Sequence, residues 1–568
     1  MANVRELDVK SLPDLREMLY TVTGICDTCV AFHEKREGFY QHISYGRLRE
    51  ELEALGTALG GVVPHGARVL IVGKSSYAWA LAFLSVSCLG GVPVPVDASL
   101  SGQALRELLT KARIDAVLCD DATAKHLSGV ADLPIIPFDT FPALIARGRA
   151  AVLAGDDRFR TAPLSACAPA AVFYTAGRAG GALGVVLSHQ GILATLSALG
   201  KALPVSDADI FLSVLPLSRA YECVAGLLFP LSRGASVAFC EGVGTIMRNM
   251  REIHPTCMVA VPYLATRIHD KFWELVGDAG NEAAIRRAIA ISDPVRPLAA
   301  RQSLKERLLA AARQPFGGAL RTMLVVGDIS PAVCKGLRQI GIFAAQGYGI
   351  TECAGVAAVN TREAYRDGTV GLPLAGITVD IYNKQKDGSG EIRLKGDGVM
   401  LGYDGDAAST KAAVQNGWYY TGDLGRIDKD GFLHVIGRRQ NCIERANGTL
   451  VSPEELEQMI AQSPLVSEAA VVGVLNDAGS DHEPAALIVP DADRAAEVLG
   501  TDYTEEELEA AVAGWLSELN AAQPDAAKIA VFALRESPLP RNKRGRLLRT
   551  TLAAELDAAC REAGEANE

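Results

Sequence analysis

The chain carries at residues 346–352 the stretch Gln346-Gly-Tyr-Gly-Ile-Thr-Glu352, and other short motifs lie on both sides of it. On the amino-terminal side, a strand-like run that ends at Tyr174 leads into a glycine-rich stretch, Thr175-Ala-Gly-Arg-Ala-Gly-Gly-Ala-Leu-Gly184. The glycines of this stretch can bring backbone N–H groups against a phosphate. By itself the pattern is weak, because it lacks the Lys-Ser/Thr ending of a Walker loop and also fits a plain glycine-rich turn.

Further motifs follow on the carboxyl-terminal side. Residues 418–425 are Trp418-Tyr-Tyr-Thr-Gly-Asp-Leu-Gly425, and residues 437–443 are Gly437-Arg-Arg-Gln-Asn-Cys-Ile443. A third stretch is Asn447-Gly-Thr-Leu-Val-Ser-Pro-Glu-Glu-Leu-Glu457. Taken singly, Asp423 is most simply a turn residue and Tyr348 a core aromatic. Because all the motifs occur together in this order and spacing, we instead interpret both residues as candidate site residues.

Up to about residue 435, apolar β-rich runs alternate with Ala/Leu-rich helical stretches. This alternation predicts parallel sheets with helices on both faces. From Gly390 onward, short alternating strands with turn signals indicate an antiparallel or barrel-like piece. The β-rich runs are Arg68-Val-Leu-Ile-Val, Ala116-Val-Leu-Cys, Ala170-Ala-Val-Phe-Tyr-Thr and Ser236-Val-Ala-Phe, and the short strands are Glu391-Ile-Arg-Leu-Lys and Phe432-Leu-His-Val-Ile.

A small α+β domain is expected after Gly437, where a polar stretch follows the last short strand. Ser452-Pro-Glu-Glu predicts a capping box with proline at the first helical position. Thr504-Glu-Glu-Glu predicts a second capping box, which is followed by apolar residues at helical spacing. We expect that stripe to be core, and its members are Leu508, Val512, Trp515, Leu516 and Leu519.

Length, composition and charge exclude several classes of protein. The chain has 568 residues, of which 49% are hydrophobic and 22% charged. It is therefore too long for one core and too apolar for disorder. The formal net charge of −11, without a basic block, gives no reason to expect nucleic acid as a partner. A small-molecule partner fits better.

Cysteine usage and the amino terminus bear on the compartment. The twelve cysteines are scattered, with Cys26 and Cys29 as the only close pair, so neither a disulfide framework nor a zinc site is expected. The amino-terminal residues 1–8 carry charges where a signal peptide needs an apolar core. We therefore expect a cytoplasmic protein.

The uncharged stretch from Ser75 to Val96 is long enough to cross a bilayer. A Gly90-Gly91 pair and two prolines, Pro93 and Pro95, interrupt it. The interruption predicts a helix of about 14 residues followed by a short extended piece, which is typical of a buried helix–strand unit. No transmembrane span is expected.

In order and spacing, the motifs resemble those of the adenylate-forming acyl-CoA synthetase superfamily, which also includes luciferases and peptide-synthetase adenylation domains. The resemblance covers nearly the whole chain. Two further stretches, Pro216-Leu-Ser-Arg-Ala-Tyr-Glu222 and His254-Pro-Thr-Cys-Met-Val-Ala-Val-Pro262, are most similar to the long-chain fatty-acid CoA ligase branch.

The resemblance implies an α/β fold in three parts. Residues 1–436 would form a large N-terminal domain of doubly wound sheets plus a distorted β-barrel, which binds AMP and the acyl group. Residues 437–441 would form a hinge, and residues 442–568 a small mobile α+β domain. In the family this small domain rotates after adenylation and exchanges a lysine loop for a face that admits the thiol.

The activity that the resemblance implies is activation of a carboxylic acid by ATP. The carboxylate attacks the α-phosphate, pyrophosphate leaves, and a thiol then displaces AMP, so charge on phosphorus must be neutralised. The implied cofactors are ATP, Mg²⁺ and CoA. Tyr348 would stack on adenine, Thr351 would hydrogen-bond the α-phosphate, and Glu352 would hold Mg²⁺.

Other site residues are carried over by the same resemblance. Asp423 would accept both ribose hydroxyls, and Arg438 would also reach the ribose. Glu222 either belongs to the acyl region or is a buried structural carboxylate paired with Arg219, and both interpretations stay open. The remaining nucleotide-site residues would be Thr175, Gly177, Arg178, Gly180, Gly184, Gly327, Asp328 and Gly347, with Arg219 and Gly448 in the acyl and CoA region and Gln440 in the hinge.

The glycine-rich stretch departs from the family's pattern. The family's phosphate loop usually carries Ser or Thr hydroxyls and a Pro-Lys-Gly ending, whereas the lysine position here is Leu183. Arg178 adds a permanent cation with five donors to the same loop. Our hypothesis is that Arg178 substitutes for the lysine. Alanine replaces the family's other side chains here, at Ala176, Ala179 and Ala182.

The carboxyl-terminal motif departs as well. Leu539-Pro-Arg-Asn-Lys-Arg-Gly-Arg-Leu-Leu-Arg549 matches a motif whose Gly-Lys lysine touches both substrates, but the position after the glycine is Arg546. Arginine keeps the positive charge of the family's lysine but has a different shape. Lys543 is an alternative donor. The same residues could instead form a solvated basic loop.

The hinge and the acyl region depart too. Gln440 stands where the family tends to have Lys or Asp, and Arg219 where related ligases often have His. Arg219 suggests an acyl substrate with an acidic or polar tip. The sequence thus predicts a fatty-acid CoA ligase. It leaves open a catalytically weakened relative that binds nucleotide or acyl groups as a scaffold, or an enzyme that loads a carrier-protein thiol.

Overall fold

The structure of the protein, a computed structural model, describes residues 4, 7–100, 102–127, 133–176, 182–278, 280–290, 309–310, 312–446, 449–476, 480–541 and 547–556. The chain divides into two units, and each is described by itself. The large unit comprises residues 1–380, 393–420 and 428–434. The small unit comprises residues 381–392, 421–427 and 435–568.

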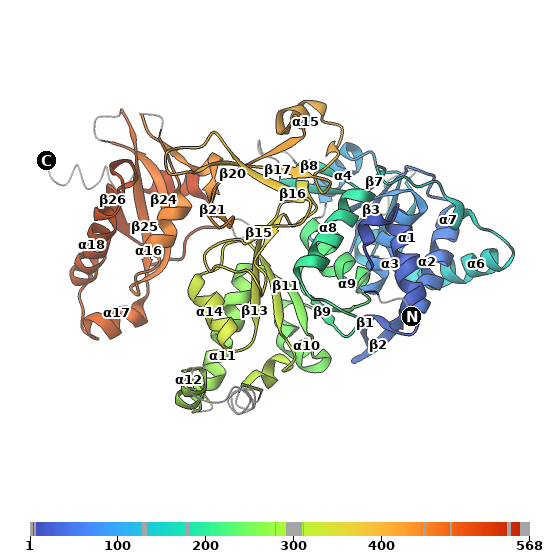
Figure 1. Cartoon of the computed structure of the whole chain (residues 1–568), viewed down its shortest axis with the longest axis horizontal. Helices are drawn as coiled ribbons and strands as arrows, with labels where there is room; N and C mark the ends of the chain where they lie inside the picture. Colours follow the sequence, from blue (N-terminus) through green and yellow to red (C-terminus); the bar gives the residue numbers. More distant parts are fainter. Residues whose placement is uncertain are drawn as a thin grey trace. The chain divides into compact units, whose positions relative to one another are not determined.

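A nine-stranded sheet forms the centre of the large unit (Figure 1). In hydrogen-bonded order its strands are β15 (Leu372–Pro373), β14 (Ala358–Val359), β13 (Phe343–Tyr348), β12 (Thr322–Val326), β11 (Cys257–Ala260), β9 (Ile210–Ser213), β10 (Ser236–Phe239), β1 (Val30–Arg36) and β2 (Phe39–Ser44). From β13 to β1 neighbouring strands run parallel, and β2, β14 and β15 add antiparallel edges. Alternate residues of β12 enter different cores, Met323 and Val325 on one face and Leu324 on the other. Burial of both faces explains the continuous apolar runs in the sequence.

A second, four-stranded sheet of the large unit is parallel throughout. Its order is β4 (Val92–Val96), β3 (Arg68–Val72), β5 (Ala116–Cys119) and β6 (Ile135–Pro137). The stretch from Ser75 to Val96 forms a buried helix at Tyr77–Leu89 and then β4, as predicted. Val92 donates its N–H to Ala67 O, so residues 93 and 95, which alternate with it, direct their backbone nitrogens away from β3. Prolines, which have no N–H, occupy those two positions at the edge.

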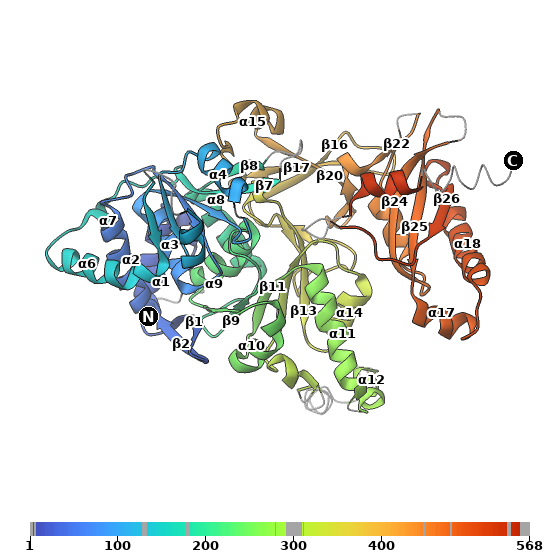
Figure 2. The same ribbon diagram turned by 180° about the vertical axis from the view of Figure 1, so that it is seen from behind.

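Helices cover both faces of these sheets, as Figures 1 and 2 show for the large unit. Beside β13, α11 and α14 lie together over one face (Figure 2). Within the described part of the chain, no helix combines the length and the apolar character that crossing a bilayer requires. The helices of this unit are α1 (Leu15–Ile25), α2 (Tyr45–Leu59), α3 (Tyr77–Leu89), α4 (Gly102–Lys111), α5 (Asp121–Leu127), α6 (Phe141–Leu153), α7 (Arg158–Thr161), α8 (His189–Ala202), α9 (Phe229–Ser232), α10 (Ile246–Ile253), α11 (Pro262–Asp278), α12 (Glu282–Ala290), α14 (Pro331–Gln339) and α15 (Ala407–Ala413), with short 3₁₀ turns η2 (Val9–Ser11), η3 (Phe138–Thr140), η5 (Val243–Thr245), η6 (Gln314–Phe316) and η7 (Thr351–Cys353) and a π-helix, η4 (Glu222–Leu228).

The run at residues 170–175 was expected in a parallel sheet, and that expectation is wrong. It belongs to β7 (Pro169–Ala176), which pairs antiparallel with β8 (Ala182–Ser188), and β8 in turn pairs antiparallel with β18 (Gly402–Tyr403). The physical reason is connection length. Five residues join β7 to β8, which suffices for a hairpin but not for a parallel crossover. The glycine-rich stretch therefore joins two strands rather than a strand and a helix.

The short strands expected after Gly390 belong to a five-stranded, curled half-barrel sheet that begins earlier, at Ile377. Its order is β16 (Ile377–Tyr382), β17 (Gly390–Gly396), β20 (Trp418–Ile427) and β19 (Val414–Gln415), with β21 (Leu433–Arg438) paired to β20. Residues of this sheet belong to both units.

The small unit also contains an α+β layer (Figure 1, orange and red). Its elements are η8 (Arg439–Asn441), β22 (Ile443–Glu444), β23 (Leu450–Val451), α16 (Pro453–Ile460), β24 (Val466–Leu475), β25 (His482–Pro490), α17 (Ala492–Leu499), α18 (Glu505–Ala521), η9 (Asp525–Ala527) and β26 (Val531–Leu534). Of the two predicted capping boxes, the one at Thr504 is complete, with Glu507. At Ser452 one half is found: the Ser452 side chain accepts a hydrogen bond from Glu455 N–H, before a helix that starts with proline as predicted. The predicted stripe is core, with Leu508, Val512, Leu516 and Leu519 buried and Trp515 partly buried.

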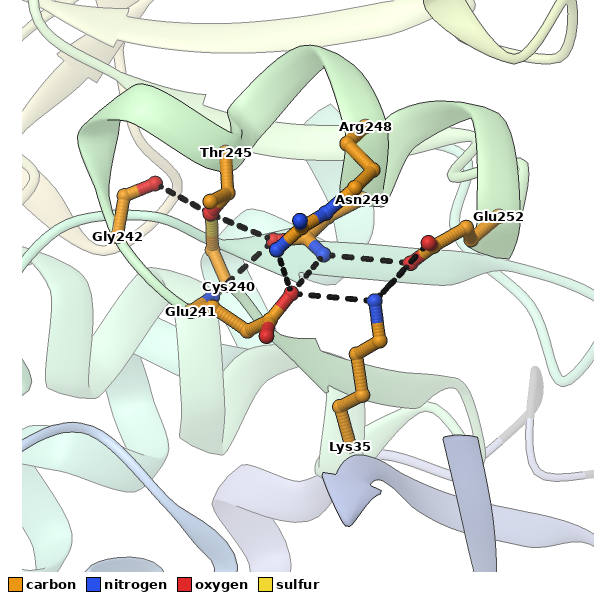
Figure 3. A network of polar contacts seen from close by, with 8 residues as sticks. All are labelled: Lys35, Cys240, Glu241, Gly242, Thr245, Arg248, Asn249 and Glu252. Carbon is orange, nitrogen blue, oxygen red and sulfur yellow. Dashed lines mark hydrogen bonds and ion pairs between the residues drawn. The ribbon is translucent and has the colours of Figure 1, made fainter. Parts of the chain in front are cut away.

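A polar network connects α10 to strand β1 and to the segment that follows β10 in the nine-stranded sheet (Figure 3). Asn249, fully buried, donates to Glu241 Oε2 at 2.8 Å and accepts from Glu241 N–H at 3.1 Å. Lys35 of β1 bridges Glu241 at 3.2 Å and Glu252 at 2.7 Å. Hydrogen bonds from Asn249, Arg248 and Lys35 lower the pKa of Glu241 to about 2.

Candidate functional site

The carboxyl ends of β12 and β13 bring several predicted residues to one edge of the nine-stranded sheet. Because the two strands are parallel neighbours, their carboxyl ends meet at the same edge, where open α/β sheets bind ligands. Gly327, directly after β12, donates its N–H to Gly347 O at 3.2 Å. Gly327 has a φ of +129°, and a Cβ there would lie 2.9 Å from Pro262. Asp328 follows and is exposed.

The segment after β13 folds back tightly and presents two polar side chains. Gly349 approaches Gly355 O so closely that a Cβ would lie 1.8 Å from it, so only glycine fits there. The turn closes through a hydrogen bond from Gly355 N–H to Ile350 O at 3.0 Å. Thr351 and Glu352 lie on this turn and are partly exposed. Tyr348, at the end of β13, is 7% exposed, so little of its ring surface is open to a ligand.

The Glu352 carboxylate is held by a neutral partner. Its Oε1 accepts a hydrogen bond from Tyr403 Oη at 3.0 Å, and its backbone carbonyl accepts from Met400 N–H at 2.8 Å. A carboxylate that is held by a hydroxyl, rather than by Lys or Arg, keeps its negative charge for a cation. Mg²⁺ takes oxygen ligands and is commonly held by one or two carboxylates together with substrate phosphates. Glu352 therefore fits the predicted role of metal ligand.

Thr175 and Gly184 lie on facing strands at the base of the glycine-rich turn, Thr175 in β7 and Gly184 in β8. Gly184 is buried, and a Cβ there would lie 2.9 Å from both the Tyr174 ring and the Asp404 side chain, so this glycine is required by packing. The described residues leave out the turn itself. Predicted site residues that fall outside the described part of the chain are Gly177, Arg178, Gly180, Gly448, Lys543 and Arg546.

Within the small unit, Asp423 and Arg438 lie together, as both would have to do to reach one ribose. Asp423 on β20 is 5% exposed, and its Oδ1 lies 3.3 Å from Arg438 Nε. Its N–H donates to Thr421 Oγ1 at 3.0 Å, and Thr421 in turn donates to Ile392 O at 2.7 Å. The Asp423 backbone is therefore held within β20, and its carboxylate contacts Arg438 of the paired strand β21, whose side chain, 41% exposed, has donors available.

The predicted hinge segment, residues 437–441, is tied to the small unit. Gln440 is exposed in η8. Asn441 Nδ2 donates to Glu454 Oε1 at 2.5 Å. A Cβ at Gly437 would lie 2.4 Å from Ser452 Oγ, so the chain passes close to the first turn of α16.

Glu222 and Arg219 do not form the pair that the sequence left open, so the predicted pairing is wrong, although Glu222 is a buried carboxyl group as that alternative expected. Glu222 is fully buried in η4, and its Oε1 accepts from Ser213 Oγ at 2.6 Å, while Oε2 has no hydrogen-bond partner among the described residues. Burial raises the pKa of Glu222 to about 8. Arg219 precedes the π-helix and is exposed to solvent, where a guanidinium costs nothing to hydrate.

Two residues near the candidate site were not singled out from the sequence. Tyr403, on β18, holds Glu352. In the small unit, Glu391 accepts from Gly422 N–H at 2.9 Å and lies 3.4 Å from Arg439. It therefore connects the part of β20 that carries Asp423 to the hinge segment. Tyr403 stood in a Gly-Tyr-Asp stretch between two predicted strands, and nothing local in that stretch points to a carboxylate far away in sequence.

Comparison with known families identifies the family of the chain. The family model described as "AMP-binding enzyme" matches residues 26–404, and that described as "AMP-binding enzyme C-terminal domain" matches residues 440–565. The chain belongs to the AMP-binding enzyme family. The resemblance inferred from the motifs, and the α/β fold with a large N-terminal and a small C-terminal domain, are thereby confirmed.

Several curated proteins to which the chain is similar are long-chain-fatty-acid–CoA ligases. The chain is 26% identical over 475 residues to long-chain-fatty-acid–CoA ligase FadD15 of Mycobacterium bovis, covering 78% of this chain and 77% of that protein. It is 27% identical over 489 residues to long-chain-fatty-acid–CoA ligase 5 of Mus musculus, covering 78% and 71%.

Solved structures of the family share the fold. ATP-bound MatB from Rhodopseudomonas palustris superposes with a TM-score of 0.74 at 20% identity, covering 95% of this chain and 99% of that one. The o-succinylbenzoate CoA synthetase MenE from Bacillus subtilis, in complex with its acyl-adenylate intermediate, superposes with a TM-score of 0.70 at 21% identity, covering 95% and 98%.

Proposed function

We propose that this protein is an AMP-forming acyl-CoA ligase that activates a fatty acid with ATP and transfers the acyl group to CoA. The observation that carries the proposal is the Thr351–Glu352 turn at the carboxyl edge of the nine-stranded sheet, with Glu352 held ready for a cation by Tyr403. Membership of the AMP-binding enzyme family supports the reaction class. The long-chain relatives support a fatty acid as the substrate.

In the first half-reaction, a carboxylate oxygen of the acid attacks the α-phosphorus of ATP. The bond from that phosphorus to the pyrophosphate oxygen breaks, which yields an acyl-adenylate and pyrophosphate. Thr351 would donate its hydroxyl to an α-phosphate oxygen, and Glu352 would hold Mg²⁺, which would supply positive charge to the phosphates. Tyr348 contacts the adenine, with Gly327, Asp328 and Gly347 lining the pocket.

The ribose is held, in our proposal, by the small unit. The Asp423 carboxylate accepts from the two ribose hydroxyls, and Arg438 donates to the ribose from the next strand. A carboxylate that accepts two hydroxyl protons binds more strongly than a neutral acceptor, because its hydrogen bonds are charge-assisted. The basic residues outside the described part, Arg178, Lys543 and Arg546, supply the cations that the family's lysines provide.

In the second half-reaction, the CoA thiol attacks the acyl carbonyl carbon and the bond to AMP breaks. Residues 437–441, with Gln440 at the pivot, act as the hinge that lets the face around Gly448 replace the basic loop near the acyl group. The domain ranges that we propose remain 1–436, 437–441 and 442–568. The proposed location is the cytoplasm.

The acyl pocket sets the substrate class. Arg219 is exposed at the start of the segment that carries the buried Glu222, so its guanidinium is available to an anionic group. We propose an acyl chain with an acidic or polar tip. Equal turnover of plain and ω-carboxy fatty acids of the same length would contradict that choice.

ATP–pyrophosphate exchange across a panel of carboxylic acids tests the function. The expected result is exchange that depends on a fatty acid, and then AMP release that depends on CoA. Nucleotide binding without exchange for any acid would contradict the ligase and favour the scaffold, which the replacement of the family's lysine by Leu183 also favours. AMP release that requires a carrier protein instead of CoA would identify the carrier-loading alternative.

A further inference from the structure

A short segment, residues 400–404, lies between the turn that carries Glu352 and strand β8. We call this segment the brace. Met400 N–H donates to Glu352 O at 2.8 Å, and Leu401 N–H donates to Val186 O at 2.8 Å. Backbone hydrogen bonds therefore fix the brace to the turn on one side and to the hairpin on the other.

The far end of the brace is anchored at the base of the glycine-rich turn. Asp404 N–H donates to Gly184 O at 2.7 Å, and the Asp404 carboxylate accepts from Tyr174 Oη at 3.1 Å. Arg68 contacts both oxygens of this carboxylate in a bidentate pair. Burial alone would raise the pKa of Asp404, but the Arg68 guanidinium keeps it below its ordinary value. Both strands of the hairpin are thus joined to the brace.

Tyr403 is the side chain of the brace that reaches the candidate site. Its hydroxyl lies 3.0 Å from Glu352 Oε1 and 3.3 Å from the Tyr419 hydroxyl, and Tyr403 N–H donates to Thr410 Oγ1 at 2.8 Å. Tyr403 is 7% exposed and Tyr419 2%, so packing fixes the Tyr403 phenol in place. Glu352 itself is only partly buried.

We propose that Tyr403 is a positioning residue that orients the Glu352 carboxylate toward a nucleotide-bound Mg²⁺ and, through the brace, fixes it relative to strands β7 and β8. A phenol donates one proton, so it occupies one side of Oε1 and leaves Oε2 for the cation. Being neutral, it leaves the carboxylate its full charge. Tyr403 acts in this way only if Glu352 holds Mg²⁺, as proposed above for the ligase.

Tyr403→Phe removes the hydroxyl and keeps the ring. Loss of an outer partner of a metal ligand costs about ten- to a hundred-fold in metal affinity. We therefore expect the gain in ATP affinity on adding Mg²⁺ to shrink by about tenfold, with ATP binding in EDTA unchanged. In the exchange assay, the half-saturating Mg²⁺ concentration should rise by a similar factor, and the rate should recover at high Mg²⁺.

The measurement is calorimetric titration of ATP into the full-length protein, once with MgCl₂ and once with EDTA. The matched control is Tyr45→Phe, which also loses a buried phenol hydrogen bond, to Ala235 O at 2.7 Å, and does not contact Glu352. In a Glu352→Gln background, Tyr403→Phe should have no further effect on the response to Mg²⁺, because the two residues act through one contact.

Three results would overturn the proposal. They are an unchanged Mg²⁺ response in Tyr403→Phe, an equal loss in the Glu352→Gln background, and wild-type ATP binding that does not respond to Mg²⁺. If Tyr403→Phe does not fold, Tyr419→Phe removes the contact between the Tyr419 and Tyr403 hydroxyls instead and, by loosening the Tyr403 phenol, should weaken the Mg²⁺ response alone. Absence of acid-dependent exchange in the wild type would contradict the proposed function but not the binding test, which needs no turnover.

Discussion

At the scale of single residues, Glu222 is a carboxyl group in a fully buried environment that opposes its ionisation. A carboxyl group in a fully buried π-helix has one hydroxyl partner, Ser213, and one oxygen without a partner among the described residues. The sequence marked Glu222 as unusual because it lies in an apolar run. It did not predict that Arg219 would be exposed rather than paired with Glu222, because this depends on the π-helical start of the segment.

The raised pKa of Glu222 makes stability depend on pH. Between its ordinary pKa of 4.5 and its native pKa of about 8, the unfolded state is ionised and the native state is protonated. Stability therefore falls as pH rises through this window, by about 1.4 kcal/mol for each pH unit. Glu222→Gln, which cannot ionise, should match the wild type at pH 5 and be more stable at pH 8. Urea unfolding at three pH values measures the difference.

A control with the opposite sign is Glu241→Gln. The pKa of Glu241 is lowered to about 2, so its contribution is present above pH 4.5 and disappears as the pH falls toward 2. This variant should be less stable than the wild type at neutral pH and equal to it in strong acid. Parallel curves for Glu222→Gln and the wild type would show that the carboxyl group ionises normally.

Asp423 allows a test of nucleotide binding that does not involve the metal. Asp423→Asn keeps the shape but loses the charged acceptor, so we expect ATP to bind roughly tenfold more weakly, with tripolyphosphate binding unchanged. Asp387→Asn, in the same unit and hydrogen-bonded to Ser389 within its own turn, is the control. Equal losses for ATP and tripolyphosphate would place Asp423 away from the ribose.

At the scale of elements, features that depend on local sequence were predicted correctly more often than the pairing of strands. The helix and strand at residues 77–96 and the caps at Ser452 and Thr504 are as expected, because periodicity and capping chemistry are local. The β7–β8 hairpin was missed, since a strand's direction depends on its partner. Tyr403 was missed for the same reason, because its partner Glu352 is 51 residues away.

The network of Figure 3 should matter for stability at this scale. Asn249→Ala removes a fully buried amide together with its hydrogen bonds to Glu241 and Thr245, and we expect a loss of about 2 kcal/mol in unfolding free energy. Arg248→Ala, from the same helix and network, removes a side chain that is 51% exposed and should cost less than about 1 kcal/mol. Chemical denaturation compares them, and similar losses would mean that burial does not set the cost.

At the scale of the whole molecule, the family's two half-reactions need two arrangements of the carboxyl-terminal domain. Motif order predicted the family and the reaction class, and the family models agree. The acyl substrate did not follow from the sequence, because the shape of a pocket depends on packing among many distant side chains.

The hinge can be tested by separating the half-reactions. Proline fixes φ, so Gln440→Pro should restrict rotation at η8. We expect ATP–pyrophosphate exchange to stay within about twofold while CoA-dependent thioester formation falls at least about tenfold. Gln440→Ala should retain both activities. A parallel fall of the two in Gln440→Pro would indicate general damage, and an unchanged rate of thioester formation would place the pivot elsewhere.

The prolines of β4 have a consequence for the burial of that strand. All five residues of β4 are buried, and β7 packs against the strand, so it is not an edge open to solvent. A buried N–H group without a partner costs free energy. Pro93 and Pro95 occupy the positions of β4 whose nitrogens face away from β3. Because proline has no N–H, β4 can be buried on that side without leaving a donor unsatisfied.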